Sequence, residues 1–436
     1  MITRYRIRKL LAPTAGMRRS LLKFVIGSLM LLAGLAVSFK VLMLPTINSV
    51  ARFWRGLLES FVPPEQIEVT NHVLGGLFLV TGLYLTYVGA KGVIRKFFEA
   101  INPGSGSKMV NQYVRRQQLA NGPRIVALGG GTGLSTLLRG LKQHSSNITA
   151  IVTVTDDGGS SGRLVQDLKI IPPGDLRNCL VSLADAEKLM TDIFQYRFKG
   201  EAGSLSGHSL GNLLIAALVE ISGGDFEEAL RMTSEVLAIR GRVLPSTFDH
   251  VRLRALMEDD TEICGETAIA QAGKRIRRIY MDPPDASAYR EAIDAIRDAE
   301  LIAIGPGSVF TSVIPNLLIP GIAEAVRQSQ ARKAYICNVM TQRGESDAFT
   351  AAEHVVALQA NIPAKVFDYV LVNTGIPSQE SLERYMESNQ FMVEPDIDRI
   401  RAMDFQIVPG NFMSESDYVR HDPLRVAASL MGLLDK

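Results

Sequence analysis

Two adjacent aspartates in a glycine-rich segment are the clearest candidates for chemistry in this 436-residue sequence. Asp156 and Asp157 belong to the segment TDDGGSSGR, which follows an apolar, β-branched run. A carboxylate at such a place accepts hydrogen bonds from ribose hydroxyls, and a pair of carboxylates can hold a hydrated divalent ion beside a phosphate. The structural alternative is a turn in which both aspartates cap backbone amides. Further candidate ligands in the segment are Gly159, Ser160, Ser161 and Arg163.

A glycine cluster, GGGTG at Gly129 to Gly133, is the second candidate. It follows a short apolar run and precedes a helical pattern, so a helix N-terminus can offer free N–H groups to a phosphate. The dinucleotide fingerprint G-x-G-x-x-G fails because Leu134 or Thr136 stands where its third glycine belongs, and no Walker GK[ST] follows. The position between strand and helix predicts a phosphate or nucleotide site. Its ligands would be Gly130, Gly131, Thr132 and Gly133.

Four more polar turns contribute candidates. In PPGDLRN, Asp175 is expected to cap the helix that follows it. In GHSLGN, His208 is either a hydrogen-bonded residue at a helix start or an acid–base group. GPGS and NVMTQRGE each follow an apolar run, as ligand-binding turns do in open α/β sheets. The candidate ligands from these turns are Asp175, Arg177, Asn178, His208, Ser209, Asn212, Gly305, Gly307, Ser308, Asn338, Thr341, Gln342 and Glu345.

The elements that must position these turns alternate between strands and helices. This alternation predicts an α/β fold with a Rossmann-like, doubly wound, mainly parallel sheet, whose carboxyl edge gathers the polar turns. Residues 156–174 read as a long functional loop. The strand-like runs are 124–129, 148–155, 301–305, 333–339 and 368–373. The helical runs are 134–141, 208–221, 225–239, 286–299, 311–328 and 423–434.

Two apolar runs near the N-terminus predict a membrane hairpin, with transmembrane helices at about 22–44 and about 72–92. A signal peptide is the rival interpretation of the first run, but no small-x-small cleavage site precedes Pro45 and a second run follows. A buried hairpin in a soluble domain is the structural alternative. We therefore expect a hairpin at 1–98, a basic linker at 99–122 and the main domain at 123–436.

The charge distribution gives an orientation and excludes one class of ligand. Basic residues cluster before the first run and after the second, so the positive-inside rule predicts a multi-pass protein of the cell membrane with both termini and the main domain in the cytoplasm. Residues 125–436 carry 30 basic and 41 acidic residues. Such an acidic domain lacks the basic face that nucleic acid requires. The three widely spaced cysteines predict neither a disulfide framework nor a zinc site.

The chain from about residue 123 to residue 436 resembles the bacterial gluconeogenesis factor family, a branch of the 2-phospho-L-lactate transferase-like superfamily. Seven motifs carry the resemblance in this order: GGGTGLSTLLRGLK, TDDGGSSGRL, PPGDLRNCL, FQYRF, GHSLGNLLIAAL, GPGSVFTSVIPNLL and NVMTQRGE. The resemblance implies a fold that binds UDP-sugars such as UDP-N-acetylglucosamine. It also implies a role in cell shape and cell-wall precursor supply during growth on gluconeogenic carbon sources. The N-terminal hairpin departs from the shorter members.

Two functions from different classes follow. The leading hypothesis is a membrane-anchored UDP-sugar-binding regulator that requires no cofactor. The alternative is a metal-dependent transferase acting on a nucleotide-activated donor, in which Asp156 and Asp157 match the paired aspartates of the related transferases and hold Mg²⁺. An NAD-dependent oxidoreductase is disfavoured by the broken fingerprint. The sequence supplies no clear nucleophile–base pair, and it leaves open a monomer or a homo-oligomer.

Overall fold

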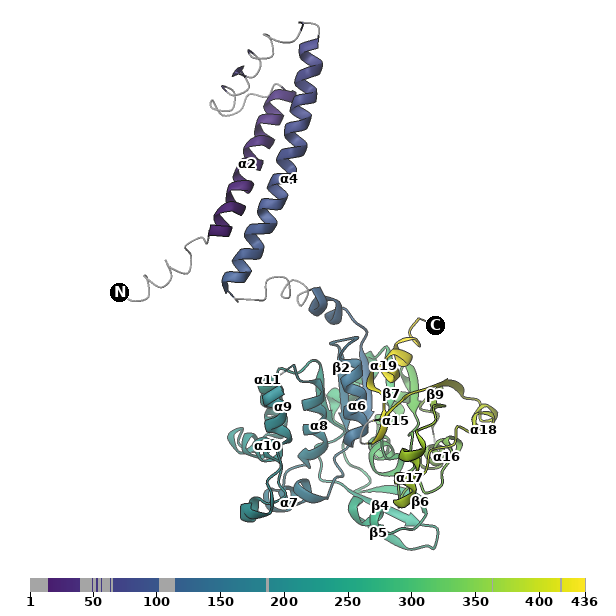
Figure 1. Cartoon of the computed structure of the whole chain (residues 1–436). Coiled ribbons are helices and arrows are strands. Elements are labelled where there is room, and N and C mark those ends of the chain that lie inside the picture. The colour runs from purple at the N-terminus through teal and green to yellow at the C-terminus, as the bar shows by residue number, and fades with distance from the viewer. Residues whose placement is uncertain are drawn as a thin grey trace. The chain divides into compact units, whose positions relative to one another are not determined.

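The structure, a computed structural model, describes residues 15–39, 66–101, 114–185, 188–362, 364–415 and 418–435, together with residues 49, 52, 53, 56 and 63 (Figure 1). The chain divides into two compact units, Met1–Arg115 and Arg116–Lys436. Residues 102–113 of the predicted linker, and most of the predicted loop between the two apolar runs, lie outside the described residues.

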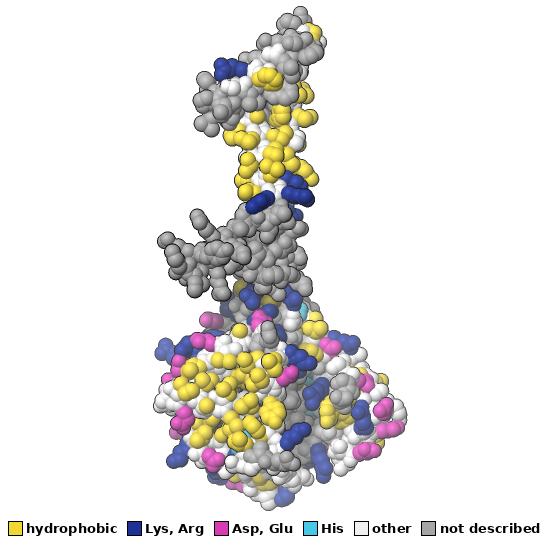
Figure 2. Space-filling model, turned by 60° about the vertical axis from the view of Figure 1, so that its left-hand side comes forward, with side chains coloured by type: hydrophobic (Ala, Val, Ile, Leu, Met, Phe, Trp, Pro, Cys, Tyr) yellow, Lys and Arg dark blue, Asp and Glu magenta, His cyan; other side chains and the backbone are white. Residues whose placement is uncertain are grey.

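Two long apolar helices make up most of the described part of the first unit. They are α2 (Ala15–Phe39) and α4 (Ile67–Ile101), packed against each other along their length. Glycines lie at the contact: a Cβ on Gly27 would lie 2.4 Å from the backbone nitrogen of Thr86, and one on Gly89 would lie 2.4 Å from that of Phe24. Small residues of this kind let two membrane helices approach closely. Hydrophobic side chains cover the outer surface of the pair (Figure 2).

One described helix, Val69–Ile94, is long and apolar enough to cross a membrane. The predicted span at about 72–92 falls within it. The predicted span at about 22–44 does not meet the same criterion in the described residues, and its residues 40–44 lie outside them. By length and composition, the structure therefore supports a single crossing helix.

The second unit is built on a seven-stranded sheet in which every neighbouring pair of strands is parallel. Central strands are buried along their whole length, as a parallel sheet covered on both faces requires. In spatial order the strands are β10 (Gln406–Gly410), β9 (Tyr369–Asn373), β8 (Arg332–Ile336), β7 (Leu301–Ile304), β1 (Ile125–Gly129), β2 (Ile148–Val152) and β3 (Arg242–Pro245).

The strand order reverses between β1 and β7, because the chain leaves β1 toward β2 and returns later on the other side as β7. In open α/β sheets, ligands bind outside the carboxyl ends of the strands at this switch point. The glycine turn after β1 and the GPGS turn after β7 both lie there. The prediction of a Rossmann-like, mainly parallel α/β fold is confirmed.

Helices cover both faces of the sheet. Helices α6, α8 and α19 pack together as one layer, while α13 packs on α15. Right-handed crossovers running in opposite directions from the switch point place these two groups on opposite faces. The helices are α6 (Gly131–Leu141), α7 (Gly159–Leu168), α8 (Pro173–Leu183), α9 (Lys188–Gln195), α10 (Leu210–Ile221), α11 (Phe226–Leu237), α12 (Glu266–Gln271), α13 (Arg290–Asp298), α14 (Ile314–Leu318), α15 (Ile322–Gln328), α16 (Ala351–Asn361), α17 (Gln379–Glu387), α18 (Ile397–Ala402) and α19 (Pro423–Met431).

Two small antiparallel sheets complete the unit. The first, with β4 (Arg252–Met257) between β5 (Glu262–Cys264) and β6 (Ile276–Asp282), is inserted between β3 and β7 and carries α12. The second is a hairpin of β11 (Met413–Glu415) and β12 (Val419–His421). Neither sheet was expected from the sequence.

Two predictions about elements are wrong in detail. Residues 156–174 are not one long loop, because α7 occupies the centre; its buried positions include Ser160, Ser161 and Gly162, which carry no apolar periodicity. The helix expected at 311–328 is divided into a π-helical turn at Val309–Val313, then α14 and α15. Pro320 and Gly321, the latter with a φ of +92°, separate α14 from α15.

Candidate functional site

Two glycine turns lie against each other at the switch point. A Cβ on Gly133 would lie 2.4 Å from the carbonyl oxygen of Pro306, so only glycine lets the turn after β1 approach the turn after β7 this closely. Gly131 has a φ of +59° and begins α6. The first amides of an α-helix have no intrahelical acceptor, so those of Thr132 and Gly133 are available to a ligand in the adjacent cleft.

A cleft of about 490 Å³ opens beside these turns. It is a mostly polar space that draws on both halves of the sheet, as a nucleotide site in this fold requires. Ten of the predicted ligand residues line it: Gly130, Gly131, Thr132, Gly133, Gly307, Ser308, Asn338, Thr341, Gln342 and Glu345. Lining residues outside that prediction include Thr136, Glu266, Thr311, Ser312, Tyr385, Gln390, Tyr418, Arg420 and His421.

Asp175 ties the first glycine turn to α8. Its Oδ2 accepts the backbone N–H of Gly131 at 2.6 Å. The residue that caps α8 is Pro172, so the expectation that Asp175 caps its own helix is wrong: it caps a neighbouring one. Burial, followed by repulsion from Asp156, raises the pKa of Asp175 to about 6.

Glu266 adds a second shifted carboxyl group to the cleft. It is the first residue of α12, and its Oε2 accepts a hydrogen bond from Thr155 Oγ1 at 3.2 Å. Burial, followed by repulsion from Asp156, Asp175 and Glu345, raises the pKa of Glu266 to about 9. This acid is therefore protonated at neutral pH.

The GPGS turn is held by residues of NVMTQRGE. Asn338 accepts the N–H of Gly307 at 3.2 Å and donates to its carbonyl at 3.0 Å. The buried carboxyl group of Glu345 accepts hydrogen bonds from Ser308 and from Thr311, the latter at 3.1 Å. Burial raises the pKa of Glu345. The structure thus brings two motifs together that lie about 30 residues apart in the sequence, with Gly305 (φ +80°) at the start of the turn.

The adjacent aspartates Asp156 and Asp157 accept hydrogen bonds from different partners. Asp156 Oδ1 accepts the N–H of Gly158 at 3.0 Å, whereas Asp157 Oδ1 accepts the N–H and the hydroxyl of Thr267 at 2.9 and 2.7 Å. Both line a second cavity of about 680 Å³ on the other side of the Thr155–Glu266 contact from the cleft. Asp157 thus fastens the start of α12 to the segment after β2.

Six predicted ligand residues form a buried network with one another instead of lining the cleft. Arg177 donates to Ser209, to Asn212 Oδ1 at 2.8 Å and to Asn178 Oδ1 at 2.8 Å. Burial and nearby Arg197 lower the pKa of Arg177 to about 10. Ser160 Oγ lies 3.1 Å from His208 Nδ1 and accepts from Asn212 Nδ2 at the same distance. These contacts join α7, α8 and α10 through polar side chains.

The remaining predicted residues lie beside this network. Ser161 is buried against Gly174, where an added Cβ would lie 2.4 Å from its hydroxyl oxygen. Arg163 donates to the carbonyl oxygen of Ser206 at 2.8 Å. Gly159 adopts a φ of +50° at the start of α7. Each of the three has a role in shaping the segment between β2 and α8.

The C-terminal hairpin supplies a wall of the cleft that no motif indicated. The exposed guanidinium of Arg420 stacks on the ring of Tyr418 at 5.1 Å and forms no ion pair with a described residue. The ring of His421 is enclosed, and burial lowers its pKa to about 4. An Arg–His pair just before the helix-capping Asp422 was the only sequence signal for this wall.

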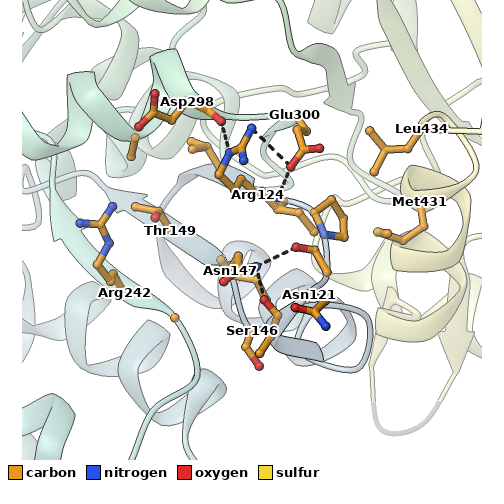
Figure 3. Close-up of a pocket in the computed structure, with 18 of the residues that line it drawn as sticks. Asn121, Arg124, Ser146, Asn147, Thr149, Arg242, Asp298, Glu300, Met431 and Leu434 are labelled. Atoms are coloured by element: carbon orange, nitrogen blue, oxygen red, sulfur yellow. Dashed lines mark hydrogen bonds and ion pairs between the residues drawn. The ribbon is translucent and has the colours of Figure 1, made fainter. Parts of the chain in front are cut away.

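A larger cavity of about 1170 Å³ lies at the opposite, amino edge of the sheet (Figure 3). Arg124, one of its charged side chains, is engaged with the protein: its Nε donates to the carbonyl of Asp298 at 2.5 Å, and its guanidinium lies 3.6 Å from Glu300. Size alone would favour this cavity. The glycine turns and helix N-terminus that suit a phosphate lie at the other edge, so we take the smaller cleft as the candidate site.

The donor set tests the alternative that the aspartate pair holds a metal ion. The described residues contain no group of three or more His, Cys, Asp and Glu side chains arranged to bind one. Thr267 already occupies Asp157 Oδ1, and the carboxylates of Asp156 and Asp157 have separate partners. The pair supplies at most two carboxylate ligands, so a divalent ion held here would need its remaining ligands from water or a phosphate.

Comparison with known proteins places this geometry in a family. A family model described as 2-phospho-L-lactate transferase CofD matches residues 125–413. The gluconeogenesis factor of Bacillus subtilis is 48% identical over 313 residues, which cover 72% of this chain and 98% of that protein. A protein of Nostoc sp. (strain PCC 7120) is 43% identical over 97% of this chain and 91% of its own length.

A solved structure agrees with these matches. The crystal structure of a Bacillus halodurans protein of the UPF0052 family is 46% identical, with a TM-score of 0.68 over 71% of this chain and 99% of that one. The Bacillus matches have about the length of the second unit, while the Nostoc match covers so much of this chain that it includes part of the N-terminal unit. The chain belongs to the gluconeogenesis factor family, whose common domain is of the 2-phospho-L-lactate transferase type.

Proposed function

We propose that this protein is a membrane-anchored regulator that binds a UDP-sugar, with UDP-N-acetylglucosamine as the expected ligand. In this proposal it supports cell shape and cell-wall precursor supply during gluconeogenic growth. The observation that carries the proposal is the cleft where the turns of Gly133 and Pro306 meet at the switch point of the sheet. Membership of the gluconeogenesis factor family supports the biological role.

The cleft offers two kinds of donor to a diphosphate. The first amides of α6 lie at the positive end of the helix dipole. Arg420, which has no carboxylate partner among the described residues, can fork onto phosphate oxygens. It is also the charged group that lowers the pKa of Arg139, after burial. Arg139 and Arg420 are thus two neighbouring cations in a domain with more acidic than basic residues, and such a pair favours an anionic ligand.

The proposed location is the cell membrane, with α2 and α4 as an antiparallel hairpin. The close approaches of Gly27 to Thr86 and of Gly89 to Phe24 show that the start of α2 lies beside the end of α4. Arg18, Arg19 and Lys23 of α2 therefore lie at the same end as Lys91 of α4. The positive-inside rule places that end in the cytoplasm.

Tags at residue 1 and residue 436 test this location. Both should resist external protease in intact cells and become sensitive after the membrane is opened. Cleavage of either tag in intact cells would contradict the proposed orientation.

Calorimetric titration of the full-length protein in detergent with UDP-N-acetylglucosamine tests the ligand. We expect saturable binding with Mg²⁺ and with a chelator, and recovery of intact UDP-sugar afterwards by mass spectrometry. Arg420→Gln should weaken binding about tenfold or more, because a charge-assisted hydrogen bond contributes about 1.5–3 kcal/mol. Undetectable binding by the wild-type protein at millimolar ligand would reject the proposal.

The second candidate function is the metal-dependent transferase. It is favoured by the family model, whose description names a transferase. Abolition of binding by chelator, or consumption of a nucleotide-activated donor, would support it. The hydrogen bonds of Asp157 to Thr267 oppose the aspartate-pair form of this mechanism.

A further inference from the structure

Glu266 occupies an unusual place for a carboxyl group. It lines the same cleft as Gly131 and Gly133, the turn that suits a phosphate. It enters the cleft from α12, on the small inserted sheet between β3 and β7, and belongs to none of the seven sequence motifs. An ionised carboxylate at this position would repel an anionic ligand.

The hydrogen bonds of Glu266 leave one oxygen free. Thr155 Oγ1 donates to Oε2 at 3.2 Å and lies 3.1 Å from Thr153 Oγ1. Oε1 has no protein hydrogen-bond partner among the described residues, and no lysine or arginine within that part of the chain pairs with this side chain. The carboxyl group therefore has one oxygen fixed by protein and one available to a ligand.

The groups that face Glu266 are all acidic. Asp156 follows β2, Asp175 lies in α8 and Glu345 follows β8, whereas β4 and β5, which pack against α12, contribute no group that shifts this acid. Together with burial, these groups raise the pKa of Glu266 to about 9. At neutral pH the side chain is a neutral acid, which can donate a hydrogen bond.

We propose that Glu266 is a specificity-determining residue of the cleft, whose acid O–H donates a hydrogen bond to an acceptor oxygen of the bound nucleotide sugar. The diphosphate oxygens are the nearest candidates, because the first amides of α6 line the same cleft. Acids kept neutral by apolar surroundings and like charges serve as donors in other binding sites. This inference rests on the proposed function, since it deepens the description of the same site.

Conservative variants of the full-length protein in detergent test the inference with UDP-N-acetylglucosamine as the probe. Glu266→Gln replaces the acid with a neutral donor of the same shape, so its affinity at pH 7 should stay within about twofold of the wild type. Glu266→Ala lacks the donor and should bind about two- to tenfold more weakly. Glu258→Gln, on the same inserted sheet but away from the cleft, is the control and should change nothing. Melting curves confirm that each variant is folded.

The pH dependence supplies a second readout. A donor that must be protonated acts fully below its pKa and is lost as pH rises through it. Wild-type affinity should therefore fall relative to Glu266→Gln between pH 7 and pH 10. The uracil ring also loses a proton in this range, but it does so equally with both proteins, so the ratio of the two affinities isolates Glu266.

The opposite pattern would overturn the inference. If Glu266 acted as an ionised acceptor for a sugar hydroxyl, Glu266→Gln would weaken binding about tenfold at pH 7. The wild type would then gain affinity over the variant as pH rises. That result would leave the proposed function intact, whereas no binding by the wild type at any pH would reject the function itself and the inference with it.

Discussion

The carboxylate of Asp175 accepts the backbone N–H of Gly131 across 2.6 Å, although 44 residues separate the two in the sequence. The bond holds the first turn of α8 against the first residue of α6. The bond also places the Asp175 carboxyl group beside a glycine turn that suits an anion. Because the pKa of Asp175 is raised to about 6, this carboxyl group is partly protonated near that pH. The bond therefore joins the glycine turn to the PPGDLRN segment.

Asp175→Asn should remove a pH dependence of stability. The pKa of Asp175 is raised from 3.8 to about 6, so the folded state holds the proton more tightly than the unfolded state. Its contribution is fully present below about pH 3.8 and is lost as pH rises toward 6 and above, a change of about 3 kcal/mol. Asparagine cannot ionise. The variant should become more stable than the wild type above pH 6.

Melting temperatures between pH 4 and pH 8 measure this effect. Asn361→Ala, which removes the buried acceptor of the Ile279 N–H and lies outside the cleft, is a control for general loss of stability. It should lower the melting temperature by a similar amount at every pH. Parallel curves for Asp175→Asn and the wild type would contradict the assignment of the raised pKa.

The fold could be predicted from the sequence because its central strands carry an unambiguous signal. IVALG and YVLVN are continuous apolar runs, and runs of that kind are typical of strands buried on both faces. The sheets β4–β6 and β11–β12 could not be predicted in the same way. Arg252 and Arg254 alternate with buried residues on β4, and β11 and β12 have three residues each, too few for any periodicity.

Arg177→Met should destabilise the fold while leaving the cleft unchanged. The substitution removes the donor to Ser209, Asn212 and Asn178, so buried acceptors lose their partner. We expect a loss of about 2–3 kcal/mol of stability. Affinity for UDP-N-acetylglucosamine in the folded protein should stay within about threefold of the wild type.

Arg197→Met is the matched control for Arg177→Met. Its guanidinium is exposed and donates to the carbonyl of Gly207 at 2.7 Å, so its loss should cost less than about 1 kcal/mol. Melting curves and titrations at one temperature compare the two variants. A large loss of affinity in a stable Arg177→Met protein would mean that the buried network contacts the ligand.

Asp156→Asn and Asp157→Asn separate the ribose role from the metal role. If the ribose of a ligand in the cleft extends past the Thr155–Glu266 contact to Asp156, the amide variant should bind about ten- to a hundredfold more weakly with a change in stability below about 1 kcal/mol. Asp157→Asn should cost no more affinity than Asp156→Asn, because its carboxylate holds Thr267. Titrations with Mg²⁺ and with a chelator measure both. Loss of an Mg²⁺ dependence only in Asp157→Asn would favour the transferase.

The sequence allowed the backbone turns of the candidate site to be predicted, but it predicted fewer of the side chains that line the cleft. Glycine turns are visible in a sequence because no other residue suits their φ values or close approaches, as Gly131 and Gly133 show. Polar side chains beside such turns can equally serve the protein interior, and Ser160, Arg177 and Asn212 do so. Glu266 and Arg420 reach the cleft through tertiary structure alone, from segments about 135 and 290 residues beyond the first turn.

Deleting residues 1–95 should release a folded, soluble domain that still binds UDP-N-acetylglucosamine. The second unit, Arg116–Lys436, has its own sheet and core, and the described apolar helices α2 and α4 lie outside it. Gel filtration without detergent and calorimetry measure the outcome. Affinity should match that of the full-length protein within about threefold. A well-folded truncation that fails to bind would show that the N-terminal unit contributes to the site.

Gly133→Ala should disrupt the cleft by separating its two turns. The added methyl group would lie 2.4 Å from the carbonyl oxygen of Pro306, a backbone atom that cannot move aside as a flexible side chain can. Overpacking of this kind costs about 1–3 kcal/mol of stability. Because the displaced turns carry the amides of α6 and the GPGS backbone, affinity for UDP-N-acetylglucosamine should fall at least tenfold even where the protein stays folded.

Gly223→Ala is the control for Gly133→Ala. The φ of Gly223 is +72° and its added Cβ would meet nothing within 4 Å, so the substitution should strain the backbone without changing affinity. Melting curves and titrations compare the variants, and unchanged affinity in Gly133→Ala would show that the ligand does not bind between the two turns.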